Sequence, residues 1–239
     1  MRFTTPATLA LLLILGACAT PSADSLAEND PWEATNRDTF AFDVWVEHHI
    51  AQPVVEGYRV VVPEPAREGM HNVVTNLRSP VVLANDILQA RPRRAAQTLA
   101  RVVLNTTVGL GGLIDIASKV GIPYHDNDFG ITLGVAGAQE GSYLVLPLLG
   151  PKPPRDLVGG LVDGAFDPFT WSRFPGRHEL LTARTGLDIA DTADRNLDQF
   201  TAIERSSIDF YASTRSLYRQ SRAAQIRGEG GLFQNLPEL

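Results

Sequence analysis

Cysteine, lysine and long apolar runs are the scarce features of this 239-residue chain. Cys18 is the only cysteine, which excludes an internal disulfide and a cysteine-rich metal site. The longest apolar stretches, residues 101–121 and 131–149, are interrupted by glycine, asparagine, glutamate or proline. Neither is an unbroken run of about 20 apolar residues, so we expect neither to cross a bilayer as a single helix.

Basic residues are fewer than acidic ones. The chain has 21 lysines and arginines against 27 acidic residues and a formal net charge of −6, which disfavours nucleic acid as a partner. Lys119 and Lys152 are the only lysines, so almost every cation is an arginine. Arginine is the better bidentate ligand for phosphate, although a GC-rich genome produces the same bias.

Motifs of catalysis and metal binding are also missing. His178-Glu179 begins like a zinc-protease helix, but Thr182 stands where the second histidine is needed. The segment 126–130 resembles a calcium loop only faintly, because its glycine falls one position early. There is no G-x-S-x-G nucleophile elbow and no phosphate-binding loop. We predict no catalytic residue, no metal and no cofactor.

The N-terminus has the pattern of a bacterial lipoprotein signal peptide. Arg2 precedes an uncharged apolar run over residues 7–15, which is too short to span a bilayer. Leu15-Gly16-Ala17-Cys18 follows and resembles the lipobox. We predict a signal peptide over residues 1–17, cleavage before Cys18, and lipidation of Cys18 with acyl chains such as palmitate, which anchor stably when several are attached. The alternative is an ordinary secretory signal in which Cys18 is incidental.

The remainder divides into a tether, a helical body and a C-terminal helical region. Residues 18–28 are small and polar, and we expect them to form a flexible tether for the lipid anchor. We predict the body over residues 29–175 and the helical C-terminal region with its tail over residues 176–239. Ala19 follows the cysteine instead of an aspartate, which favours the outer membrane over inner-membrane retention.

Proline and capping patterns predict the helix starts of the body. Asp30 is the expected N-cap of a helix with Pro31 at its first position. This helix is apolar on every side from Phe40 to Ile50, as in a buried or lipid-facing helix. Further helices are expected to begin at Pro65, Pro80 and Pro92.

One long amphipathic helix is expected in the C-terminal region, ended by the glycines from Gly228 onward. Its apolar face would carry Leu197, Phe200, Ile208, Tyr211 and Tyr218. No strong alternating strand pattern is present, and the chain is predicted to be mainly α.

A series of motifs in one order resembles the MlaA (VacJ) lipoprotein family. The first is Asp30-Pro31-Trp32-Glu33 followed by Asn36-Arg37, which resembles the family's opening signature. The similarity covers about residues 29–170, and the later matching motifs are residues 62–69, 76–80, 104–115, 129–134, 141–148 and 167–168.

The resemblance implies a compact, ring-like, single-domain helical body embedded in one leaflet of the outer membrane, with a periplasmic C-terminal amphipathic helix. It implies a position beside trimeric porins, on the periplasmic side. Misplaced phospholipid would leave the outer leaflet through a central channel and pass to a periplasmic carrier protein, which maintains lipid asymmetry. The chain itself would not be an enzyme.

Candidate site residues follow from the sequence and this resemblance together. The lipid-facing or channel candidates are Phe40, Phe42, Trp45, Val46, Asn105, Gly109, Gly111 and Gly112. The porin-contact candidates are Tyr143, Leu144, Leu146 and Leu148. The arginines proposed to guide phosphate head groups are Arg37, Arg59 and Arg101.

Alternatives remain for each of these assignments. Structural salt bridges explain the three arginines equally well, and the glycines could simply end one helix and turn into the next. At the level of the whole protein, a scaffold that binds porin without moving lipid is the main alternative, and an envelope hydrolase with an unusual site is a remote one.

Overall fold

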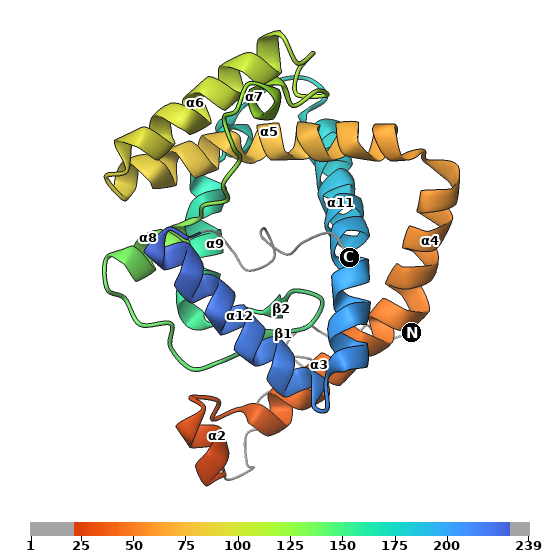
Figure 1. Ribbon diagram of the computed structural model, residues 1–239, viewed down its shortest axis with the longest axis vertical. Coiled ribbons are helices and arrows are strands. Elements are labelled where there is room, and N and C mark those ends of the chain that lie inside the picture. Colours follow the sequence, from red (N-terminus) through yellow and green to blue (C-terminus); the bar gives the residue numbers. More distant parts are fainter. Residues whose placement is uncertain (1–21, 230–239) are drawn as a thin grey trace.

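The computed structural model describes residues 22–229, and this part of the chain is mainly helical, as predicted (Figure 1). The predicted signal peptide, Cys18 and residues 230–239 lie outside the described residues. The elements in chain order are α2 (Ala23–Ala27), α3 (Glu33–Val46), the π-helical segment η2 (Glu47–Ala51), α4 (Gln52–Val61), α5 (Glu64–Leu88), α6 (Pro92–Thr107), α7 (Ile116–Lys119), α8 (Phe129–Val135), β1 (Val145–Leu146), β2 (Gly150–Pro151), α9 (Pro154–Phe166), α10 (Pro168–Trp171), α11 (Arg177–Ser206) and α12 (Phe210–Arg227).

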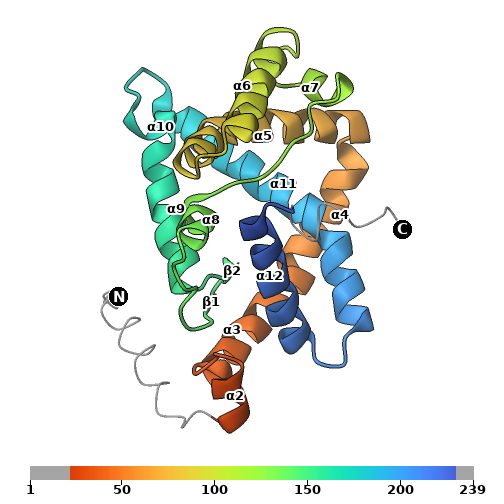
Figure 2. The same cartoon turned by 60° about the vertical axis from the view of Figure 1, so that its left-hand side comes forward.

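The helices are arranged as a ring. Helix α5 crosses the top of Figure 1, α9 and α11 descend from it, and α12 and α3 close the lower side around a central opening. Helix α4 lies outside α11, and α6 with α7 lies above α5. Figure 2 shows the same order from the side, with α11 and α12 next to each other. Helix α5 contacts α6, α9 and α11, so it is the central support of the ring.

Helices α3 and α4 form one bent arm joined by the π-helical segment η2. The arm ends at Val62, whose extended backbone matches the restriction that the following proline imposes. Helix α5 then begins at Glu64 with Pro65 in its first turn, and α6 begins at Pro92, as predicted. The sharp turn at Val62 lets α5 cross over α11.

The predicted helix start at Pro80 is wrong. Pro80 lies inside α5, which continues for 25 residues. Proline removes one backbone hydrogen bond and usually kinks or ends a helix. Here α5 packs against α6, α9 and α11, and this packing holds the helix together across the proline. The continuous α5 brings residues on both sides of Pro80 to the central opening.

The predicted N-cap role of Asp30 is also wrong. Helix α3 begins at Glu33, and its N-cap Trp32 makes no side-chain capping bond. The Asp30 carboxylate is fully buried and accepts hydrogen bonds from Asn36, Tyr211 and Arg215. Asp30 therefore joins the start of the body to α12.

The single C-terminal helix of the sequence prediction is two helices, α11 and α12. The chain leaves α11 at Ser207 in an extended conformation, and the Asp209 carboxylate accepts from the backbone N–H of Ala212 as the N-cap of α12. Asp209 also binds Arg37 at 2.7 Å. Gly228 ends α12 with a positive φ of 85°, as the glycine run predicted.

The segment expected to be a flexible tether contains the short helix α2. Ser22 caps this helix by accepting from the backbone N–H of Ser25, and Ser25 is buried. A regular, capped turn therefore lies directly before the body within the predicted tether.

The interior is unusually polar. Over residues 22–229, fifteen polar or charged residues are buried against ten apolar ones. The main apolar cluster is small, consisting of Tyr143, Val145 and Tyr211 with Phe40 and Tyr218 against it. Within residues 22–229, every helix is too short or too polar to be a membrane span. The ring is held together by hydrogen bonds between polar side chains at least as much as by an apolar core.

Candidate functional site

A polar pocket of about 340 Å³ is lined mainly by residues of α5, α9 and α11, three of the helices around the central opening in Figure 1. Its wall is formed by Arg78, Val81, Val82, Asn127, Asp128, Asp163, Gly164, Asp167, Arg184, Asp188 and Thr192. The volume falls within the range of about 300–1,000 Å³ that is common for small-molecule sites. Its composition is less common, because charged side chains dominate the wall.

Two of the pocket's carboxylates are neutralised by arginines. Asp167 contacts Arg184 at 2.6 Å, and Asp128 receives a bidentate contact from Arg222, at 2.7 and 2.9 Å. Burial opposes ionisation of Asp128, but the hydrogen bonds from Arg222 outweigh it and lower the Asp128 pKa. Both carboxylates therefore already have an arginine partner.

Asp163 has neutral partners only. It accepts from the backbone N–H of Phe129 at the start of α8 and from the Asn85 side chain at 2.8 Å. Burial raises the pKa of Asp163 above its ordinary value, since these donors compensate only part of the lost hydration. Asp163 thus fixes α8 against α5 and α9 while facing the pocket.

Arg78 differs from the other cations of the site. Among the described residues it has no carboxylate within 4.0 Å and no side-chain hydrogen bond, and its side chain is solvent-exposed. Its pKa is raised, mainly by the charge of Asp126 and against the effect of desolvation. Arg78 is therefore a permanently charged donor that faces the pocket with its guanidinium unoccupied.

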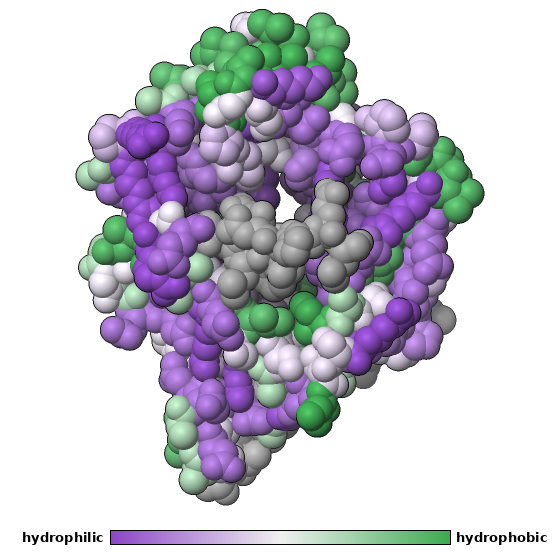
Figure 3. All heavy atoms as spheres, in the orientation of Figure 1, coloured by the Kyte–Doolittle hydropathy of each residue, from purple (hydrophilic) through white to green (hydrophobic). Residues whose placement is uncertain are grey.

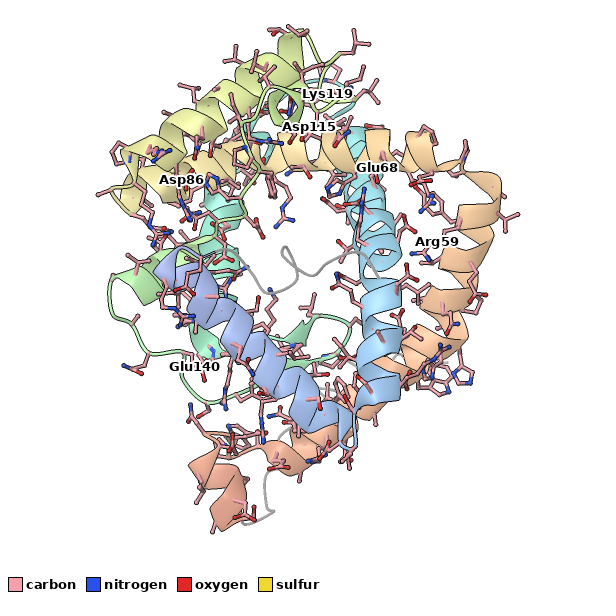
Figure 4. All side chains as sticks on the ribbon, viewed as in Figure 1. Arg59, Glu68, Asp86, Asp115, Lys119 and Glu140 are labelled. Carbon is pink, nitrogen blue, oxygen red and sulfur yellow. The ribbon has the colours of Figure 1, made fainter. Side chains whose placement is uncertain are left out.

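Paired charges also join α4 and α5 to α11. Arg59 reaches from α4 towards α11 (Figure 4) and binds Asp194, which also binds Arg67 at 2.8 Å. Burial alone would raise the pKa of Asp194, but the hydrogen bonds from the two arginines lower it. These bridges tie α4 and α5 to α11 and fix the width of the ring on this side.

The outer elements have the opposite character. Exposed large apolar side chains lie on α3, η2 and α4, on α6 and the turn to α7, and on α9 and α10, and we call this set the apolar rim. The apolar rim consists of Phe42, Trp45, Ile50, Val54, Val60, Val61, Leu99, Val103, Val108, Leu110, Leu113, Val120, Leu157, Val158, Leu161 and Trp171. Val60 and Val61 are 87% and 80% exposed. Figure 3 shows hydrophobic surface at the top edge and beside α4, and mainly hydrophilic surface above and to the sides of the opening.

This arrangement matches the two parts of an amphipathic lipid. The exposed apolar side chains of the rim fit contact with acyl chains. The polar pocket inside offers charged donors and acceptors to a head group. An amphipathic ligand would meet both kinds of surface, and the described residues hold no cluster of metal-ligating side chains.

The predicted lipid-facing residues of α3 separate into two groups. Phe42 and Trp45 are 47% and 51% exposed and belong to the apolar rim, while Val46 is half-buried. Phe40 contradicts the prediction, because its ring packs edge-on against Phe210 at 5.0 Å and against Tyr211. The cause is α12, which covers this side of α3.

Asn105 is a structural residue and not a lipid-facing one. It is 5% exposed, donates to Asp115 at 3.0 Å and accepts from the backbone N–H of Ala117. Its amide therefore closes the loop between α6 and α7.

The three glycines after α6 form a turn, which was the alternative to a gate. A Cβ on Gly109 would lie 2.3 Å from the Ile114 carbonyl oxygen, and one on Gly112 would lie 2.8 Å from the Asn76 Cβ. Gly111 has a φ of 74° and open space around it, between the exposed Leu110 and Leu113. A lipid-facing position stays a prediction for Gly111 alone, since Gly109 and Gly112 are buried.

Among the porin-contact candidates, Tyr143 is buried at 1% exposure and is wrong as a surface contact, because Asn36, Tyr211 and Tyr218 surround it. Leu144 and Leu146 are half-buried. Leu148 is 69% exposed in the turn between β1 and β2, and its backbone N–H donates to Asp43. Porin contact therefore stays a prediction for the outer side of this hairpin.

The three arginines predicted to guide phosphate are all paired. Arg37 binds Asp209 and Glu33, Arg59 binds Asp194, and Arg101 binds Asp115 at 2.7 Å. Their side chains form structural salt bridges, which was the alternative to phosphate guidance. Sequence reasoning missed Arg78, and only the continuation of α5 through Pro80 reveals that it faces the pocket.

The weak calcium-loop resemblance has a structural explanation. Asp128 caps α8 by accepting from the backbone N–H of Ile131 and binds Arg222. Asp126 lies beside Tyr124 and faces a cation, Arg78, whose pKa it raises. Asp128 therefore serves helix capping and an ion pair with Arg222, while Asp126 acts on Arg78 only through its charge.

A family model and individual relatives both match this chain to the same family of lipoproteins. The model of the MlaA lipoprotein family matches residues 28–225. The Intermembrane phospholipid transport system lipoprotein MlaA of Escherichia coli is 33% identical over 211 residues, covering 87% of this chain and 82% of that protein. The lipoprotein of the same description from Haemophilus influenzae is 31% identical over 237 residues, covering 98% of this chain and 93% of that protein.

A solved structure has the same fold. A chain from work on the structural basis for maintenance of bacterial outer membrane lipid asymmetry superposes with a TM-score of 0.73 at 30% identity. The match covers 82% of this chain and 98% of the solved chain. This chain therefore shares its fold with a protein studied for the maintenance of outer-membrane lipid asymmetry.

Proposed function

Because the chain belongs to the MlaA lipoprotein family, we propose that it takes part in intermembrane phospholipid transport and maintains outer-membrane lipid asymmetry. In this proposal it removes mislocalised phospholipid from the outer leaflet and passes it to a periplasmic carrier. Family relatives described as phospholipid-transport lipoproteins support the process. The arrangement of the ring supports the route.

The observation that carries the proposal is the polar opening inside the apolar rim. Lipid tails against the rim would cover side chains such as Val60 and Leu161, which are 87% and 74% exposed. Covering apolar surface contributes about 25 cal/mol per Å². The charged pocket would accept the head group, which avoids the cost of carrying it through an apolar medium. The body would lie within one leaflet, because no helix among residues 22–229 spans a bilayer.

We propose further that lipid on Cys18 holds the ring at the outer membrane, on its periplasmic side. The lipobox and Ala19 support this location. The exposed Leu148 and Leu149 in the hairpin turn, at 69% and 62%, are the proposed contact for a trimeric porin. A catalytic role is not part of the proposal, because the charges of the pocket are arranged for binding.

The test is the amount of phospholipid exposed on the cell surface in a strain that lacks the gene. Exposure is expected to rise in the deletion strain and to return to normal with the wild-type gene. Cys18→Ala should fail to restore it, because the body would lose its anchor. Unchanged exposure in the deletion strain would contradict the transport role.

The same strains separate transport from a scaffold function. A scaffold that binds porin without moving lipid would still capture the porin in a crosslinking experiment at Leu148. It would leave the phospholipid composition of the outer leaflet unchanged. Porin capture without a change in surface phospholipid would therefore replace the proposal by the scaffold.

A further inference from the structure

Arg78 is an available cation in a pocket whose other arginine already has a close carboxylate partner. It projects from the middle of α5, and no carboxylate among residues 22–229 lies within salt-bridge distance of it. Arg184, the second arginine of the pocket, already contacts Asp167 at 2.6 Å. A planar guanidinium with free N–H groups is suited to bidentate binding of a phosphate.

The pocket also contains an available anion. Asp188 on α11 lies 3.9 Å from Arg184, beyond hydrogen-bond distance, and its side chain is 37% exposed. Burial raises the Asp188 pKa above its ordinary value, and the positive charge of Arg184 opposes this shift. Arg184 is shared with Asp167, so it compensates Asp188 only in part. Asp188 therefore favours a positively charged group of a ligand.

The balance of charge excludes a purely anionic preference. Four carboxylates and two guanidinium groups line the pocket, and Arg222 binds one of the carboxylates from outside. A head group with net negative charge would bind Arg78, but it would have no positive group to offset its repulsion by Asp163 and Asp188. A head group that carries both a phosphate and an ammonium group would satisfy Arg78 and Asp188 together.

We propose that this pocket binds the head group of a zwitterionic phospholipid in preference to an anionic one, with Arg78 binding the phosphate and Asp188 the ammonium group. The inference rests on the proposed function and adds a selectivity to it. Arg78 supplies most of the binding, and Asp188 supplies the discrimination between head groups. Asp163 adds negative charge to the same wall.

The experiment places a photo-reactive amino acid at Thr192, an exposed pocket residue, in the full lipidated chain. The protein is reconstituted in bilayers of equal phosphatidylethanolamine and phosphatidylglycerol, and the crosslinked lipid is identified by mass spectrometry. The amount of crosslinked phosphatidylethanolamine is expected to exceed that of phosphatidylglycerol by roughly fivefold, because one solvent-accessible ion pair changes a binding equilibrium by about this factor. The same probe at Val60 in the apolar rim should capture both lipids in the proportion of the bilayer.

Substitutions assign the two roles. Arg78→Gln should reduce capture of both lipids at Thr192 by roughly tenfold, because each loses a charge-assisted hydrogen bond to its phosphate. Asp188→Asn should bring the ratio of the two lipids towards one and leave total capture nearly unchanged. Arg205→Gln is the matched control, because Arg205 lines a different cavity between α4 and α11, and it should change neither value.

Three results would overturn the inference. These are equal capture of the two lipids by the wild type, no loss with Arg78→Gln, or a loss with Arg205→Gln as large as that with Arg78→Gln. Each of them leaves the proposed transport intact if deletion of the gene still raises surface phospholipid. Capture at Val60 with none at Thr192 would instead remove the pocket from the lipid route altogether.

Discussion

The inner helices and the apolar rim of this ring differ in which side chains they bury and which they expose. The inner side holds ionised pairs such as Asp194 with Arg59 and Arg67, in positions where a soluble protein has its apolar core. The rim leaves residues such as Val60 and Val61 open, at 87% and 80% exposure. Each such side chain would contribute about 1.5–3 kcal/mol if lipid covered it.

The difference shows where the free energy of this fold arises. Inside, polar networks specify how the helices meet, because a buried polar group that loses its partner is costly. Outside, the rim stabilises the protein only when another apolar phase covers it. The inner side therefore determines the ring, and the proposed lipid contact of the rim would determine where the ring resides.

Asp30→Ala is expected to have the largest effect on the stability of the inner polar network. It would leave Arg215, Tyr211 and Asn36 buried without their acceptor. Removing one partner of a buried ion pair costs about 4 kcal/mol, and we expect a loss of this size in the free energy of unfolding, measured by urea denaturation in detergent. Asp24→Ala is the control, because Asp24 is exposed on α2 and should change stability by less than about 0.5 kcal/mol. Equal effects of the two substitutions would mean that the buried network does not hold the ring.

The rim is tested by placing a charge on it. Val60→Asp should weaken partition of the purified protein into lipid bilayers by about 2–3 kcal/mol, the cost of an aspartate within a membrane. Ile208→Asp is the control, because Ile208 is fully exposed but lies in the turn between α11 and α12, away from the rim. Flotation of vesicles with the bound protein measures both variants. A similar loss for Ile208→Asp would show that exposure alone, and not membership of the rim, decides membrane contact.

The smallest expected effect concerns Asp115, which links α6 to α7. Burial opposes its ionisation, but hydrogen bonds from Ser118, Arg101 and Asn105 lower its pKa to about 2. A lowered folded-state pKa contributes stability above the unfolded value near 4, and this contribution is lost as the pH falls towards 2. Asp115→Asn should therefore cost about 2 kcal/mol at pH 6, and the difference from wild type should shrink by pH 2.5.

Unfolding in urea across this pH range measures the effect. Asp24→Asn, at an exposed position, should show no such pH dependence. A difference between Asp115→Asn and wild type that is constant from pH 6 to pH 2.5 would contradict the role of the ionised carboxylate.

Local sequence signals predicted the elements whose causes are local. Pro65 and Pro92 begin helices and Gly228 ends one, because their backbone restrictions act within a single turn. Pro80 failed as a helix start, since packing of α5 against three other helices overrides the proline. The break before α12 was missed because Asp209 is held by Arg37, far away in the sequence.

The candidate site could be predicted only in part, for the same reason. The exposure of Phe42 and Trp45 follows from a helix that is apolar on every side. The burial of Phe40 depends on Phe210 in α12, and no pattern within α3 contains it. The Asp30 and Asn36 signature identified the family, yet its residues join α3 to α12 and do not line the pocket. Arg78 became visible only when its lack of a partner could be observed.

Phospholipid is proposed to pass through the pocket inside the ring, and Gly164→Trp would block this route. Gly164 lines the pocket on α9, and a Cβ added there would meet no atom within 4 Å, so an indole can be attached at this position without a clash at its Cβ. Gly57→Trp on α4 is the matched control, with the same open surroundings but outside the pocket. Both genes are returned to the deletion strain, and surface-exposed phospholipid is measured at equal protein levels. We expect Gly57→Trp to restore the normal, low level of surface phospholipid and Gly164→Trp to leave phospholipid exposed as in the deletion strain. Full restoration by Gly164→Trp would contradict it.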